Sequence, residues 1–175
     1  MPNHIETIRS GFRPDPVNIL YVGESAPAGG NFFYCANSAL YSCIQSAFEN
    51  VYDGECGVGE TFLNFFKDKK CYLDDLCLEP VNNLADETRQ ERRRNGIPAL
   101  AARIEEIQPK AIVVVMIGID REVKEAVNRA GLTELTENNS FYHTAAFPAY
   151  HHGQTCVENH IEVLQKLIGA GILTR

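Results

Sequence analysis

The sequence lacks the features that mark membrane and secreted proteins. No stretch approaches the roughly 20 consecutive apolar residues that a membrane-spanning helix needs, and residues 1–17 lack the apolar segment of a signal peptide. We therefore expect a cytoplasmic protein without a membrane partner. The length of 175 residues fits one domain over residues 1–175. Residues 1–17 are expected to form an extended lead-in, because they combine prolines with little periodicity.

Close cysteine pairs are also missing. The six cysteines are scattered along the chain without a CxxC pair, so nothing in their spacing indicates a zinc site or an iron–sulfur cluster. We expect no metal and no other cofactor. In a cytosolic protein such cysteines are usually reduced and act as small buried apolar side chains, which is the interpretation that we favour.

Positive charge is scarce relative to negative charge. The chain has 16 lysines and arginines against 23 acidic residues, a net charge of −7, which argues against a surface that is basic throughout. A local basic patch is still compatible with this balance. Four arginines gather in the segment RQERRR, which forms either a solvent-exposed helix face, the commoner outcome, or a phosphate-contacting cluster: Arg89, Arg92, Arg93 and Arg94.

Strand and helix patterns alternate along the chain. Apolar runs predict buried strands at 19–22 and 111–117, and less regular patterns predict strands at 71–77 and 140–148. Helical patterns fill the intervals, and Pro98 is expected to divide the pattern over 86–107 into two helices. The alternation predicts an α/β fold, a three-layer α/β/α sandwich around a mostly parallel central sheet of about four strands.

The loop after the first predicted strand has the sequence GESAPAGGNFFY. It places Glu24 and Ser25 just past the carboxyl end of the strand, where parallel α/β sheets bind their ligands. Its glycines let the backbone turn closely around a ligand. Three consecutive aromatic residues offer flat faces for stacking: Phe32, Phe33 and Tyr34. The alternative is an ordinary strand-to-helix turn with a solvated glutamate.

Polar side chains also mark two further predicted strands. Asp74 and Asp75 lie in CYLDDLC, and a buried strand carries carboxylates mainly near its end or at a site. His151 and His152 follow the last predicted strand, although adjacent loop histidines are often merely solvated. Because loops after parallel strands share one edge of the sheet, we expect Glu24, an aspartate and a histidine to meet in one crevice.

The order of these segments resembles the uracil-DNA glycosylase superfamily. YVGESAPAGGNFFY is similar to its first motif, YLDDLC to its base-reading strand, AIVVVMIG to an apolar strand, and FPAYHHG to its second motif. The resemblance covers about residues 17–168. It implies an enzyme, a monomer with DNA as its partner, that flips a damaged base out of the helix and cleaves its N-glycosidic bond without a metal.

The resemblance also implies roles for individual residues. Glu24 would position water or stabilise the sugar cation, and His151 would stabilise negative charge on the departing base. His152 stands where the family has proline, so His152 is the alternative candidate for the second-motif histidine. The cysteines of this chain do not match those of the iron–sulfur members of the superfamily, so the resemblance implies no iron–sulfur cluster. The residues implied to bind substrate are Ser25, Ala26, Phe32, Phe33, Tyr34, Asp75 and His152.

Asp75 is a departure from the family pattern, because uracil readers carry asparagine there. An ionised aspartate can only accept hydrogen bonds, so uracil O4 would be repelled unless the carboxyl were protonated. A base with an amino group is the alternative. Two other functions also fit the sequence: a noncatalytic nucleotide- or nucleic-acid-binding module on the same fold, and a hydrolase of free nucleosides. Nucleophilic Ser25 is disfavoured, since GESAPAG lacks the GxSxG pattern.

Overall fold

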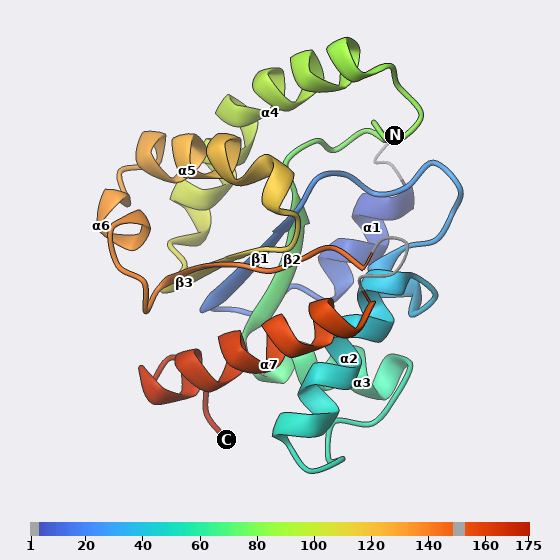
Figure 1. Cartoon of the computed structure of the whole chain (residues 1–175), viewed down its shortest axis with the longest axis vertical. Helices are drawn as coiled ribbons and strands as arrows, with labels where there is room; N and C mark the ends of the chain where they lie inside the picture. Colours follow the sequence, from blue (N-terminus) through green and yellow to red (C-terminus); the bar gives the residue numbers. More distant parts are fainter. Residues whose placement is uncertain (1–3, 149–152) are drawn as a thin grey trace.

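The computed structural model describes residues 4–148 and 153–175, which form a three-layer α/β/α sandwich (Figure 1). Within these residues one sheet of four parallel strands forms the central layer, in the order β2-β1-β3-β4. The strands are β1 (Ile19–Gly23), β2 (Cys71–Asp75), β3 (Ala111–Val114) and β4 (Tyr142–Thr144). The predicted α/β class and parallel sheet are confirmed.

Strand β1 lies in the middle of the sheet. Tyr21 pairs with Leu73 of β2 on one side and with Val113 of β3 on the other. Every residue of these three strands is buried, which explains the continuous apolar runs of β1 and β3, because helices cover both faces of the sheet. At the carboxyl edge Gly23 lies opposite Asp75, so the loops that follow β1 and β2 leave the sheet side by side.

The helices form the two outer layers (Figure 1). Helices α4 and α5 pack against each other on one side of the sheet, and α2 and α7 pack against each other on the other side. The helices are α1 (His4–Gly11), α2 (Ala39–Val51), α3 (Glu60–Asp68), α4 (Asp86–Ile107), α5 (Asp120–Arg129), α6 (Thr133–Thr136) and α7 (Gly153–Gly169), with short 3₁₀ turns η1 (Phe33–Cys35) and η2 (Ile117–Ile119). No helix in the described ranges is long and apolar enough to cross a bilayer.

Local sequence explains where α2 begins and which side it buries. The Ser38 side chain accepts a hydrogen bond from the Tyr41 backbone N–H at 3.1 Å and caps the first turn. Leu40, Ile44 and Phe48 recur at four-residue spacing and are all buried, so they form the apolar face of the helix. The cap therefore fixes the end of α2 that faces the loop after β1.

Two expectations about the elements are wrong. Residues 4–11 of the expected extended lead-in form the helix α1, which is held against the core by the partly buried Ile5 and Ile8. The pattern over 86–107 is one helix, α4, with Pro98 inside it. Pro98 has no backbone N–H to donate to the Arg94 carbonyl. Both residues are exposed, so water can solvate that carbonyl and the helix continues.

The predicted strands at 111–117 and 140–148 are also too long. Strand β3 ends at Val114 and β4 comprises only Tyr142–Thr144. The apolar residues beyond β3 continue into η2, where Ile119 is fully buried. Val115 and Ile119 are buried, whereas Ile117 is 62% exposed, so the apolar residues beyond Val114 reflect core packing only in part, and periodicity does not distinguish them from a strand.

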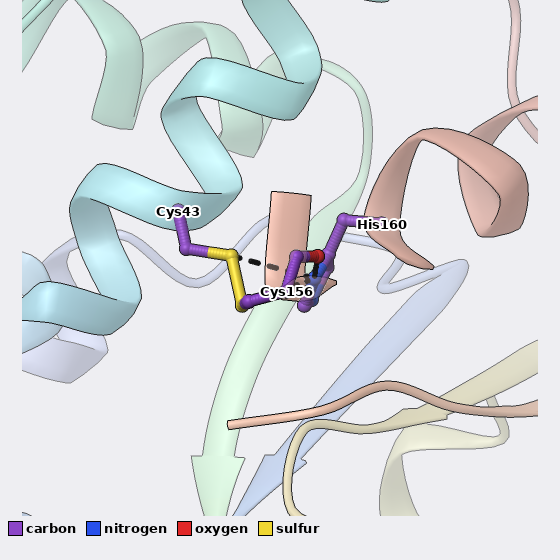
Figure 2. Close-up of side chains that lie close together, drawn as sticks. All are labelled: Cys43, Cys156 and His160. Carbon is purple, nitrogen blue, oxygen red and sulfur yellow. Dashed lines mark hydrogen bonds between the residues drawn. A yellow bond between two sulfur atoms is a disulfide. The ribbon is translucent and has the colours of Figure 1, made fainter. Parts of the chain in front are cut away.

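The expectation that the cysteines are reduced is wrong for two of them. Cys43 of α2 and Cys156 of α7 form a disulfide, with their Cα atoms 6.2 Å apart (Figure 2). The buried His160, one turn along α7, lies with Nδ1 3.6 Å from each sulfur, and the same Nδ1 donates to the Cys156 carbonyl at 2.8 Å. Because the sulfurs are bonded to each other and are not thiolates, this cluster is not a metal-ligand set.

Candidate functional site

A cavity of about 230 Å³ lies beyond the carboxyl ends of β1 and β2. Most of its wall is apolar, and it includes residues of the glycine-rich loop, the start of α2 and the end of β2. Its volume is below the usual range for drug-sized ligands, so a single ring system suits it better than a whole nucleotide. Five residues predicted to bind substrate line it: Ser25, Ala26, Phe32, Phe33 and Asp75.

Hydrogen bonds connect the loop after β1, which lines part of this cavity, to the loop after β2. The Ser25 hydroxyl accepts from the Val81 backbone N–H at 3.2 Å, and the Ala28 N–H donates to the Asn82 side chain at 3.0 Å. These contacts join the loop after β1 to the loop after β2, far apart in sequence. The loop after β1, which supplies part of the cavity wall, is therefore fixed to the loop after β2.

The three aromatic residues of the loop have different roles. Phe32 and Phe33 are buried and line the cavity. Tyr34 does not line it among the described residues; its hydroxyl donates to the Leu73 carbonyl at 3.2 Å and accepts from the Leu73 N–H at 2.7 Å. Tyr34 thus supports the end of β2, and of the three loop aromatics Phe32 and Phe33 can contact a ligand in the cavity.

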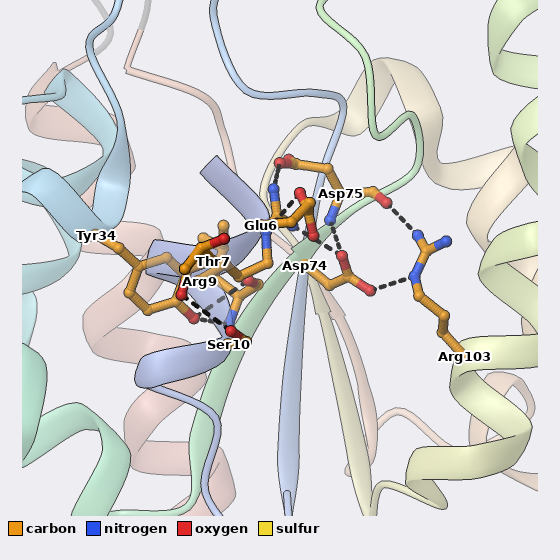
Figure 3. A network of polar contacts seen from close by, with 9 residues as sticks. Glu6, Thr7, Arg9, Ser10, Tyr34, Asp74, Asp75 and Arg103 are labelled. Carbon is orange, nitrogen blue, oxygen red and sulfur yellow. Dashed lines mark hydrogen bonds and ion pairs between the residues drawn. The ribbon is translucent and has the colours of Figure 1, made fainter. Parts of the chain in front are cut away.

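A buried arginine connects the two aspartates of β2 (Figure 3). Arg9 of α1 is 1% exposed, and its Nη1 and Nη2 donate to Asp74 Oδ1 at 2.8 Å and Asp75 Oδ2 at 2.6 Å. Arg103 of α4 donates through Nε to Asp74 Oδ2 at 2.7 Å and through Nη2 to the Asp75 carbonyl at 2.6 Å. Both Asp74 oxygens are therefore engaged by arginines, and only Asp75 of this pair lines the cavity.

Charge and burial act in opposite directions within this cluster. Burial raises the pKa of the Asp75 carboxyl above its ordinary value, while the charge and hydrogen bond of Arg9 oppose that rise. Burial by itself would lower the pKa of Arg9, but Asp75 and Asp74 more than compensate and raise it. Arg9 therefore remains charged, and because its N–H groups only donate, Asp75 Oδ2 is held as an unprotonated acceptor.

Glu24 lies at the same edge of the sheet but belongs to a different network. Arg89 of α4 donates to both of its oxygens, through Nε to Oε1 at 2.6 Å and through Nη2 to Oε2, and Arg93 Nε donates to Oε1 at 2.6 Å. Burial alone would raise the pKa of Glu24, but these hydrogen bonds and charges hold it below its ordinary value. Among the described residues Glu24 does not line the cavity.

The arginine-rich segment therefore has two kinds of member. Arg89 and Arg93 pair with Glu24 and are only partly exposed, whereas Arg92 and Arg94 are exposed. The sequence suggested a solvated helix face or a phosphate-contacting cluster, and the exposed pair is compatible with either. For Arg89 and Arg93 the solvated-face interpretation is wrong, because an intramolecular carboxylate binds both of them.

The two histidines of the predicted second motif, His151 and His152, lie outside the described residues. Phe147, which lies shortly before them in the sequence, is 41% exposed and lines the cavity. The described histidines of the sheet and of α7 have other partners: His143 Nε2 lies 3.1 Å from the Ser140 carbonyl, and His160 is beside the disulfide. The acid–histidine pairing predicted from the sequence thus stays a prediction.

Sequence reasoning missed Arg9 and Arg103. The one available signal was the pair of adjacent carboxylates inside a buried strand, since buried acids require cationic or hydrogen-bonding partners. That requirement identifies no particular arginine among those in the chain. Arg9 in particular belongs to the segment expected to be an extended lead-in.

Neither the models of known protein families nor the curated proteins match this chain. The resemblance to the uracil-DNA glycosylase superfamily therefore stays a prediction.

Proposed function

We propose that the chain is a DNA glycosylase-type hydrolase, which flips out a deaminated or damaged base, uracil or a related one, and cleaves its N-glycosidic bond. The observation that carries the proposal is the small apolar cavity at the carboxyl edge of the sheet, with Phe32, Phe33 and the carboxylate of Asp75 in its wall. Two aromatic rings suit a planar heterocycle, and the carboxylate can fix its orientation. DNA is the partner of a monomeric protein in this proposal.

The reaction requires few chemical groups. The oxygen of water bonds to the sugar C1′, the bond from C1′ to the base nitrogen breaks, and the electron pair of that bond leaves with the base. Glu24 accepts the proton from water or stabilises the sugar cation, and His151, or His152, stabilises the departing anion. Because Arg89 and Arg93 bind the oxygens of Glu24, this role requires the carboxylate to release at least one of these contacts when DNA binds.

The ion pairs of Glu24 also favour a second candidate function. A carboxylate bound by two arginines and absent from the described cavity wall suits a binding module that holds a base without hydrolysing it. The net charge of −7 favours, more weakly, a hydrolase of free nucleosides.

We also propose a cytoplasmic location. The disulfide between Cys43 and Cys156 argues against it, because disulfides are rare in cytosolic proteins.

Base excision followed by alkaline cleavage tests the proposal. Single- and double-stranded oligonucleotides carrying uracil, hypoxanthine, xanthine, or an oxidised or alkylated base are incubated with wild type, Glu24→Ala, His151→Ala and the control Glu134→Ala, an exposed acid on α6. We expect strand breaks with wild type and the control, and their loss in the other two variants. Absence of product from every oligonucleotide would contradict the proposal, and product from free nucleosides alone would favour the nucleoside hydrolase.

A further inference from the structure

The carboxylate of Asp75 is fixed in position from several directions. Arg9 Nη2 donates to its Oδ2 at 2.6 Å, and Arg103 holds its backbone carbonyl at 2.6 Å. Its Oδ1 occupies space beside Gly23, since a Cβ added to that glycine would lie 2.5 Å from Oδ1. The carboxylate therefore cannot rotate freely to suit whichever ligand enters.

Asp75 is also the one ionisable residue in the described wall of the cavity. Two of the polar residues there already have partners, because the hydroxyls of Ser25 and Ser38 accept backbone N–H groups. Asn31 is exposed. Among the described wall residues, Asp75 is thus the one that can present a charged acceptor to the edge of a buried ring.

An ionised carboxylate accepts hydrogen bonds and cannot donate them, and the charged Arg9, which donates to Oδ2 at 2.6 Å, favours the ionised form of Asp75 against the effect of burial. The pairing edge of uracil presents two carbonyl oxygens on either side of a single N–H, so a carboxylate there faces at least one oxygen lone pair. An exocyclic amino group replaces that oxygen by a donor, as in cytosine, and guanine presents an amino group beside a ring N–H. Acidic side chains recognise base amino groups in this manner.

We propose that the cavity selects bases that carry an exocyclic amino group on this edge and discriminates against uracil, because Arg9 holds Asp75 there as an acceptor. Deamination removes the amino group, whereas oxidation or alkylation elsewhere on the ring leaves it in place. The substrate class is then a damaged base that retains its amino group. The inference rests on the proposed function for the nature of the ligand, and on Arg9 and Asp75 for its selectivity.

Binding of matched nucleosides to the full chain tests the selectivity without requiring any reaction. Isothermal titration compares cytidine with uridine, and guanosine with inosine, which differ by the presence of the amino group. We expect wild type to bind the amino-bearing member of each pair at least about tenfold more tightly, because a site built around a polar group rejects a ligand that leaves it unpaired. Equal binding, tighter binding of uridine and inosine, or no binding of any nucleoside would overturn the inference.

Variants locate the selectivity. Asp75→Asn supplies an amide that can both donate and accept, so we expect the preference for cytidine over uridine to fall at least about tenfold. Asp68→Asn, the same change at an exposed position of α3, should leave the preference unchanged. If Asp75→Asn fails to fold, the wild-type comparison still decides the inference. An unchanged preference in a folded Asp75→Asn protein would overturn it.

The same oligonucleotide assay separates this inference from the proposed function. Excision of uracil but not of an oxidised or alkylated, amino-bearing base would support the glycosylase and overturn the selectivity. Selective nucleoside binding with no excision of any base would support the selectivity and contradict the glycosylase. A protein that neither excises any base nor binds nucleosides selectively would contradict both the glycosylase and the selectivity.

Discussion

Glu24 and Asp75 follow neighbouring parallel strands at the same edge of the sheet, yet they differ in their surroundings. Glu24 is bound by Arg89 and Arg93 from α4, which are partly exposed, and Asp75 is bound by Arg9 from α1, which is 1% exposed. Only Asp75 lines the described cavity. Position in the sequence brought both acids to the carboxyl edge of the sheet, and there arginines from different helices hold them.

The pKa values of the two carboxyl groups follow the same difference. That of Glu24 is lowered, because hydrogen bonds from two arginines outweigh the effect of partial burial. That of Asp75 is raised, because complete burial outweighs the effect of Arg9. A strand-end acid can thus be either a tightly held anion on the rim or a costly charge in the wall of a cavity.

Replacing Arg9 should have the largest effect on stability. Arg9→Met removes one partner of a buried ion pair and leaves Asp75 uncompensated, which should lower the free energy of unfolding by about 3–5 kcal/mol in urea denaturation. Arg13→Met is the matched control, because Arg13 pairs with Glu106 at an exposed site and such pairs contribute at most about 1 kcal/mol. Similar losses in the two variants would contradict the role assigned to Arg9.

A methyl group at position 23 should have an intermediate effect. Gly23→Ala places a Cβ 2.5 Å from Asp75 Oδ1, and the carboxylate cannot move away without lengthening its contact with Arg9. We expect a loss of about 1–3 kcal/mol in thermal or urea unfolding. Gly29→Ala in the same loop is the control, since no atom would lie within 4 Å of its Cβ. Wild-type stability in Gly23→Ala would show that Asp75 is free to shift.

The smallest effect on stability is expected at Glu24. The double variant Arg89→Gln/Arg93→Gln removes partly exposed ion pairs, which contribute about 1 kcal/mol or less. The pKa of Glu24 should rise, which NMR titration of its carboxyl carbon measures. Since the folded-state pKa lies below the ordinary value of 4.5, wild type loses this contribution as pH falls below 4.5, and the double variant should lose that dependence. An unchanged Glu24 titration would refute the pairing.

Much of the fold followed from the sequence by itself. Continuous apolar runs indicated β1 and β3, as expected for strands covered on both faces. Alternation with amphipathic helices determined the parallel sheet, and parallel strands bring their following loops to one edge. Phe32, Phe33 and Asp75 could therefore be predicted at a common site, although the lengths of β3 and β4 could not.

Tertiary structure alone decided the partners across the fold. The disulfide joins Cys43 to Cys156, 113 residues later, and no spacing rule connects them. Arg9 meets Asp75 across a separation of 66 residues, and Arg89 meets Glu24 across 65. The physical reason is that hydrophobic periodicity specifies which face of an element is buried, whereas a charged side chain finds its partner only after whole helices have packed on the sheet.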